Sequence, residues 1–260
     1  MDAAIAEIRL GAVDPKGSIL DIGVVSNATL APALDPAVKK SGQTTGLTRG
    51  SISALDVTVD VSYGSRKTAR FVNQIPITPG SFINSGDSGS LMVKDIASSP
   101  RAVGLLFAGS SSVAIANPIN AVLQSFGVTM VGAQSTSLTN RVLNWAKSFF
   151  QVGESHAASA QLPPHVSPSA VDAVCKVKEK HEPRLLAVPG VISVGIGHSG
   201  KTPGQVAIEV YVKDSASAGR PQLPSSLEGV DVKLVETGEI QASKSIARHA
   251  LSTTSELQPE

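Results

Sequence analysis

The residues with the clearest chemical potential are Gly86-Asp87-Ser88-Gly89, which stand directly before the apolar run Leu91–Val93. A serine nucleophile needs a place where negative charge can develop. Glycine adopts backbone conformations closed to other residues, so the amides of Gly86 and Ser88 can converge on one oxygen. The pattern therefore predicts a nucleophilic Ser88 beside an oxyanion hole. The alternative is a glycine-rich β-turn with an exposed serine.

A serine nucleophile also needs a base, and no histidine precedes Ser88. The five histidines are His156, His165, His181, His198 and His249. Nothing in their spacing places one against Ser88, although His156 and His165 fall in a predicted linker that could swing back. Each is interpreted as a solvated surface histidine.

The first 130 residues alternate short β-branched runs with Gly- and Ser-rich turns. Val57, Val59 and Val61 alternate with polar residues, which is the period-2 pattern of a half-buried strand. Expected strands are Ile19–Val25, Ala37–Gln43, Ser51–Tyr63, Arg66–Pro76, Ser90–Lys94, Ala102–Gly109 and Val113–Ala116, before a short helix over Ile119–Ser125. Many short strands of this kind predict an all-β barrel or sandwich.

The remaining residues predict a second, smaller unit. Helical spacing over Leu138–Gln151 predicts a helix that packs on the barrel, with a dimer contact as the alternative. After it we expect a helix from Pro168, strands Val191–Gly197 and Gln205–Lys213, a helical or turn segment near Pro221–Leu227, and strand Asp231–Glu236. The predicted division is 1–136 barrel, 137–152 packing helix, 153–168 linker, 169–243 small α+β domain and 244–260 polar tail.

The N-terminal part resembles the second barrel of a trypsin-like, chymotrypsin-fold serine peptidase, of the disulfide-free bacterial and plant type. The residues that carry the resemblance are Ser85–Ser90, the Gly42–Gly50 turn, Phe107-Ala108-Gly109 and Ala114–Asn120. It covers about residues 1–130, and Ser90 stands where the family usually has glycine. The fold class implied is mainly β, with the second barrel, a remnant of the first, and the α+β domain after it.

The resemblance implies a role for several residues. Ser88 would attack the acyl carbon, with the amides of Gly86 and Ser88 as the oxyanion hole. Asp87 would form a structural ion pair, which in related enzymes involves a new N-terminus; that route is not evident here. A peptide would lie along the strand edge formed by Phe107, Ala108 and Gly109.

The resemblance also implies a specificity pocket and a triad. Phe82 would sit at the floor of the primary pocket, where it would disfavour a Lys or Arg side chain. The chain order of the triad is His, Asp, Ser. Asp2, followed by small apolar residues, fits the orienting carboxylate; the alternative is a helix cap or a disordered end. Since no His precedes Asp2, we expect an N-terminally truncated peptidase.

The second unit also has a recognisable run, Leu185–Gly197, followed by Val206–Asp214. It resembles a small domain found beside bacterial trypsin-like domains, with no chemistry attached. A phosphate-loop interpretation of Gly195 and Gly197 is weak because no helix follows directly. The lone Cys175 falls among apolar helix neighbours and is interpreted as core.

Composition limits the other function classes. The net charge is +1 and no basic run suggests nucleic acid. No apolar stretch reaches the roughly 18 residues of a membrane span, and we expect that the first residues are not a signal peptide. One cysteine excludes an internal disulfide. We expect no cofactor and no metal, a peptide or protein as substrate, and a cytoplasmic location; the oligomeric state stays open.

The sequence therefore favours a serine endopeptidase by resemblance that lacks its base and is inactive as given. One alternative is a non-catalytic binding protein built on the same fold. Another is acyl transfer or ester hydrolysis at Ser88.

Overall fold

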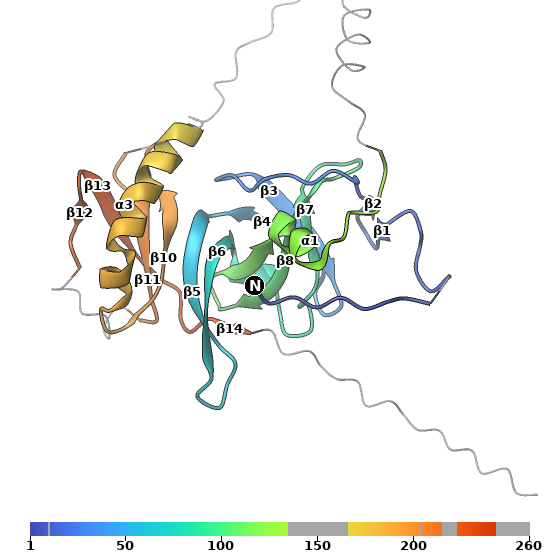
Figure 1. Ribbon diagram of the computed structural model, residues 1–260, viewed down its shortest axis with the longest axis horizontal. Helices are drawn as coiled ribbons and strands as arrows, with labels where there is room; N and C mark the ends of the chain where they lie inside the picture. Colours follow the sequence, from blue (N-terminus) through green and yellow to red (C-terminus); the bar gives the residue numbers. More distant parts are fainter. Residues whose placement is uncertain (10, 135–165, 203, 215–222, 243–260) are drawn as a thin grey trace, which may run out of the picture.

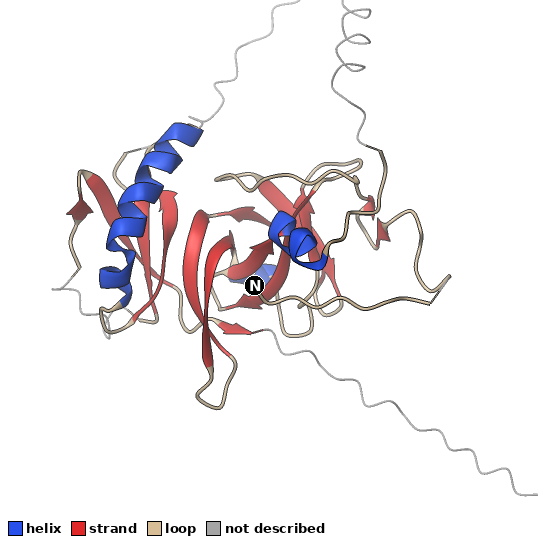
Figure 2. Cartoon of the chain, viewed as in Figure 1, coloured by secondary structure: helices blue, strands red, loops and turns tan. Residues whose placement is uncertain are grey.

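The computed structural model describes all residues except 10, 135–165, 203, 215–222 and 243–260 (Figure 1). The predicted packing helix at 137–152, most of the linker at 153–168 and the tail at 244–260 thus lie outside the described residues. Figure 2 shows that the rest is mainly β. Among the described residues, no helix combines the length and apolar character needed to cross a membrane.

The N-terminal part consists of short strands. They are β1 (Ser18–Ile19), β2 (Gly23–Val24), β3 (Ala37–Gly42), β4 (Gly46–Ile52), β5 (Ala54–Ser62), β6 (Thr68–Thr78), β7 (Leu91–Lys94), β8 (Ala102–Gly109) and β9 (Ala114–Pro118). A 3₁₀ turn, η1 (Gly80–Phe82), precedes β7, and helix α1 (Ile119–Phe126) follows β9. Gly127, with φ of 64°, ends α1 in the left-handed conformation.

Six of these strands close into a ring. β3 pairs with β4, β4 with β6, β6 with β9, β9 with β8, β8 with β7, and β7 with β3, all antiparallel. Closure removes the exposed edges that an open sheet would leave. The sequence prediction of a barrel is confirmed at this level: the chain is mainly β, with a large mixed sheet that is partly ring-closed.

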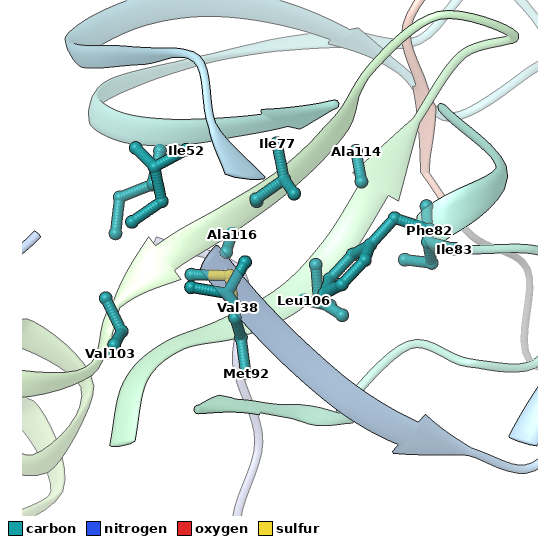
Figure 3. Packing of buried hydrophobic residues seen from close by; sticks show 11 residues of the cluster. Val38, Ile52, Ile77, Phe82, Ile83, Met92, Val103, Leu106, Ala114 and Ala116 are labelled. Carbon is teal, nitrogen blue, oxygen red and sulfur yellow. The ribbon is translucent and has the colours of Figure 1, made fainter. Parts of the chain in front are cut away.

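The interior of the ring is filled by apolar side chains from every strand. Figure 3 shows members of this cluster converging between the strands. Its buried residues are Val38, Ile52, Ile75, Ile77, Phe82, Ile83, Met92, Val103, Leu106, Ala114 and Ala116. Phe82 and Ile83 come from η1 and the residue after it, so the start of the Ser88 loop is fixed in the core.

The C-terminal part adds an α+β layer. It contains α3 (Pro168–Leu186), β10 (Val191–His198), β11 (Val206–Val212), β12 (Ser226–Leu227), β13 (Val230–Glu236) and β14 (Gln241–Ala242). The Ser167 hydroxyl caps α3 by accepting from the Ala170 amide at 3.2 Å. Helix α3 covers β10 and β11 through a cluster that includes Val174, Leu185 and Val194 (Figure 1).

The two parts share one sheet. Strand β10 pairs antiparallel with β5, with Ser193 opposite Val59 and Gly197 opposite Ala54. The sheet therefore runs without a break from the α+β layer into the barrel. The domain division predicted from the sequence stays a prediction, since its boundary falls mostly outside the described residues.

Four local expectations differ from the structure. The single strand expected over Ser51–Tyr63 is the end of β4 and the whole of β5, which are interrupted at Ser53. The strand expected over Ile19–Val25 is two paired two-residue strands, because Asp21 (φ 61°) and Gly23 (φ 86°) turn the chain. The Gly/Thr-rich turn is confined to the tip between Gly42 and Gly46, and the residues after it pair in β4. The segment expected to be helix or turn contains β12, which pairs with β13.

Candidate active site

The loop that carries Ser88 runs from Ile83 to Ser90 and is anchored from below by Asp87. The Asp87 side chain is fully buried. Its Oδ1 accepts from the Thr44 amide at 2.8 Å, and its Oδ2 accepts from Thr45 Oγ1 at 2.6 Å and the Asn84 amide at 3.0 Å. One carboxylate thus ties the nucleophile loop to the tip of the β3–β4 hairpin.

Lys40 supplies the counter-charge from inside the barrel. Its side chain is also fully buried, and its Nζ lies 3.3 Å from Asp87 Oδ2. Nζ also donates to Thr45 Oγ1 and, at 3.0 Å, to the Gly46 carbonyl. The ion pair at Asp87 is therefore formed by a strand residue of the same barrel, with no new N-terminus involved.

Both charges in this pair are perturbed. Burial works to raise the pKa of Asp87, but hydrogen bonds from Thr45, Thr44 and Asn84 outweigh it and hold that pKa below its ordinary value. Burial lowers the pKa of Lys40, and the Asp87 carboxylate opposes that shift. The Asp87 carboxylate is therefore ionised at neutral pH, because donors from three uncharged residues stabilise its negative charge.

Two backbone amides of the loop donate no hydrogen bond within the described residues. The Asp87 amide donates to the Asn84 carbonyl at 3.0 Å and the Gly89 amide to Leu106 at 2.8 Å. Within the described residues, the amides of Gly86 and Ser88 donate to no protein acceptor. Gly86 has φ of 99°, a conformation that an L residue rarely adopts. These are the two donors that the sequence assigned to an oxyanion hole, and Ser88 itself is exposed.

Asp2 and Ser88 lie on the wall of the same hollow. The two residues line one hollow of about 260 Å³, together with Ala3, Gly89 and Leu106. The Asp2 amide donates to Asn117 Oδ1 at 3.1 Å, and Asn117 Nδ2 donates to the Asp2 carbonyl at 2.7 Å.

The Asp2 carboxylate has one described partner, the hydroxyl of Tyr63. Burial, followed by this hydrogen bond, raises the pKa of Tyr63, so the phenol stays protonated and donates. The structure brings Asp2 close to the nucleophile, and its role as an orienting carboxylate stays a prediction.

The described histidines lie elsewhere. His181 Nε2 is 2.9 Å from Glu228 Oε1, and His198 Nε2 is 2.8 Å from Asp35 Oδ2. His156, His165 and His249 lie outside the described residues. Neither described imidazole contacts Ser88, so no histidine base is in place among the described residues.

A second hollow, of about 440 Å³, flanks the loop on the side of β8. It is lined by Ile83, Asn84, Ser85, Gly109, Ser110, Ser111, Glu239, Gln241 and Ala242. Gly109 lines this hollow, whereas Phe107 and Ala108 are buried in the neighbouring core cluster. Phe82, expected at a pocket floor, is fully buried in the barrel core, and its neighbour Ile83 is the residue at the hollow.

Lys40, strand β14 and the bonds between Asp2 and Asn117 were not predicted from the sequence. Lys40 had one readable signal: Val38 and Lys40 stand on the same face of a period-2 strand, so the lysine points into an apolar core and needs a carboxylate there. Strand β14 is two residues long and carries no pattern.

Among the described residues, no group of three or more His, Cys, Asp or Glu side chains is arranged to hold a metal ion. Cys175 Sγ lies 3.2 Å from Asp56 Oδ2. Burial, then the Asp56 hydrogen bond, raises the pKa of this thiol to about 12. Cys175 is therefore a protonated thiol at neutral pH and is unsuited to nucleophilic attack.

Comparison with known proteins gives structural likeness only. No family model and no curated protein matches the chain. A Cellulomonas bogoriensis chymotrypsin is 27% identical with a TM-score of 0.34, and covers 43% of this chain and 57% of its own. A glutamic acid-specific serine protease that uses a histidine triad in substrate binding is 28% identical with a TM-score of 0.36, covering 46% and 63%. Thermobifida fusca Protease A is 24% identical with a TM-score of 0.33, covering 43% and 56%.

The chain is thus similar over 43–46% of its residues to bacterial chymotrypsin-fold serine proteases, and it spans 56–63% of the length of these three structures.

Proposed function

We propose that the protein is serine endopeptidase-like: Ser88 is the nucleophile of a peptidase-type loop, and a peptide binds beside it along β8. The observation that carries this proposal is the buried Asp87–Lys40 pair. It fixes a loop in which the Gly86 and Ser88 amides have no other acceptor in the described residues. Preorganised donors of this kind stabilise the oxyanion that forms during acyl transfer.

We further propose that the chain as given is inactive on peptide bonds. Ser88 has no histidine base among the described residues, since both described histidines contact carboxylates elsewhere. Nucleophile and base act as a unit, so the loss of one removes most of the catalysis. Added imidazole can supply the missing proton acceptor in solution.

The test is covalent labelling by a fluorophosphonate, with the adduct located by peptide mass mapping. We expect slow labelling at Ser88 that rises at least tenfold with added imidazole. Ser88→Ala should remove this adduct, and Ser98→Ala, an exposed serine between β7 and β8, should label like the parent chain. Failure to label Ser88 in imidazole would overturn the nucleophile assignment.

Rapid labelling without imidazole would overturn the proposed inactivity instead, because a base would then already be present. A second candidate function is non-catalytic peptide binding on the same fold, which the engagement of the described histidines elsewhere favours. It predicts peptide binding without any Ser88 adduct in imidazole.

A further inference from the structure

The edge of β8 next to the nucleophile loop is already paired with a strand of the same chain. After β13 the chain returns to the barrel, and β14 lies between β5 and β8 (Figure 1). Gln241 pairs with Gly109 and Ala242 with Ala108, both antiparallel, while Gln241 also pairs with Ser62 of β5 in parallel. Ala108 and Gly109 are two of the three residues that the sequence analysis assigned to a peptide-binding edge.

The backbone directions show which groups make this pairing. The Ser62 amide donates to the Ile240 carbonyl at 2.9 Å, so Ile240 faces β5 and the next residue, Gln241, faces β8. On the other side, the Ser110 amide donates to Val113 at 2.7 Å toward β9, so Gly109 faces β14. Gln241 and Gly109 therefore present their N–H and C=O groups to each other.

The direction of β14 is that of a chain that approaches the nucleophile. Along β8, the register passes from Gly109 to Ala108 while β14 passes from Gln241 to Ala242. Two residues further along β8, Leu106 accepts from the Gly89 amide at 2.8 Å and its own amide donates to Ser90 at 3.1 Å. Strand β14 thus runs toward Leu106, the β8 residue that is hydrogen-bonded to Gly89 and Ser90 of the Ser88 loop.

The segment is anchored on both sides of this pairing. Ile240 is 2% exposed and packs in the cluster that contains Phe107 and Ala108. The Ser112 hydroxyl donates to the Thr237 carbonyl at 3.0 Å. Glu239, Gln241 and Ala242 also form one wall of the 440 Å³ hollow beside the Ser88 loop.

We propose that residues 239–242, here called the resident segment, occupy a peptide-binding edge on β8 as an intramolecular ligand. An extended peptide from another protein can pair with Ala108 and Gly109 only after the resident segment leaves. Main-chain pairing supplies affinity for any extended peptide, and the Asn84, Ser85, Ser110 and Ser111 lining favours an uncharged polar side chain in the hollow. This inference rests on the proposed function only in taking the β8 edge as the place where a peptide binds.

Tethering explains why the resident segment would exclude a free peptide. A segment joined by a short stretch of chain acts at an effective concentration on the order of millimolar. A peptide in solution must exceed that concentration, or the segment must be weakened, before exchange takes place.

The test compares Gln241→Pro with Gln241→Ala in the full chain. Proline removes the N–H that faces Gly109, whereas alanine keeps it and deletes only the side chain. We expect hydrogen exchange at the Gly109 amide to be slow in the parent and in Gln241→Ala, and at least tenfold faster in Gln241→Pro. A fluorescein-labelled peptide of sequence Thr237–Ala242 should bind only Gln241→Pro in fluorescence polarisation, and should slow Gly109 exchange again.

Ile240→Ala is the second variant if Gln241→Pro fails to fold, with exchange of β7 amides as the check on the barrel. It weakens the anchor without changing the backbone, and should raise both Gly109 exchange and peptide binding. Fast Gly109 exchange in the parent, or a freed edge that binds no peptide, would overturn the proposal. Fluorophosphonate labelling of Ser88 in the same variants tests the nucleophile separately, because that reagent does not need the β8 edge.

Discussion

At the scale of single residues, the buried ion pair between Lys40 and Asp87 stabilises the loop that carries Ser88. Removing one member of a buried ion pair leaves the other uncompensated, which typically destabilises by about 3–5 kcal/mol. Since Asp87 keeps its bonds to Thr45, Thr44 and Asn84, we expect Lys40→Met to lower the free energy of unfolding by about 3 kcal/mol. Urea denaturation measures this change. The exposed Lys201 offers the control, and Lys201→Met should change stability by less than about 1 kcal/mol.

The same pair sets a pH dependence with a definite sign. The folded pKa of Asp87 is below its ordinary value, so its carboxylate stabilises the fold above that ordinary value and loses this contribution as pH falls through the folded pKa. The stability gap between the parent and Asp87→Asn should therefore be widest near neutral pH and shrink below about pH 4. Urea melts at pH 3, 5 and 7 measure it. A gap that stays constant would mean that Asp87 is not ionised in the fold.

The β3–β4 hairpin is the element that meets the nucleophile loop, and Gly42 sets how closely. A Cβ on Gly42 would lie 2.4 Å from Asp87 Oδ1 and 2.9 Å from Ser90 Oγ. We expect Gly42→Ala to displace the Asp87 carboxylate, lower stability by about 1–3 kcal/mol and reduce imidazole-dependent labelling of Ser88. Gly200→Ala, where a Cβ meets nothing within 4 Å, is the matched control. Unchanged labelling in Gly42→Ala would mean that the hairpin does not position the loop.

Sequence patterns at the element scale predicted what depends on local repetition. The apolar run Ala102–Gly109 matches β8 at both ends, because a strand buried on both faces reads as a continuous apolar stretch. Strand β14 escaped prediction, since Gln241 and Ala242 pair only because the fold brings β5 and β8 to them. Ser88 and the glycines around it could be predicted as a site from the sequence. The pairing of Asp87 with Lys40 could not, because the two residues meet only once the barrel has closed.

The whole molecule is joined where β10 pairs with β5, and glycine permits that contact. A Cβ on Gly195 would lie 2.3 Å from Val57 Cγ2 across the β5–β10 pairing. A Cβ on Gly197 would instead meet Glu209 of β11, within the α+β layer. The two glycines are two residues apart on β10. Substituting Gly195 therefore tests the contact between β10 and the barrel, whereas substituting Gly197 tests the packing within the α+β layer.

If the α+β layer stabilises the barrel through this joint, Gly195→Ala should loosen β5, while Gly197→Ala should not. We expect amides of β5 to exchange at least tenfold faster in Gly195→Ala than in the parent. The free energy of unfolding of this variant should be lower by about 1–3 kcal/mol. In Gly197→Ala, faster exchange should be confined to β10 and β11. Strand β5 also pairs with β14, so loosening it in Gly195→Ala should raise exchange at Gly109 as well. Protection of β5 that is equal in the two variants would mean that the barrel holds its shape without the C-terminal layer.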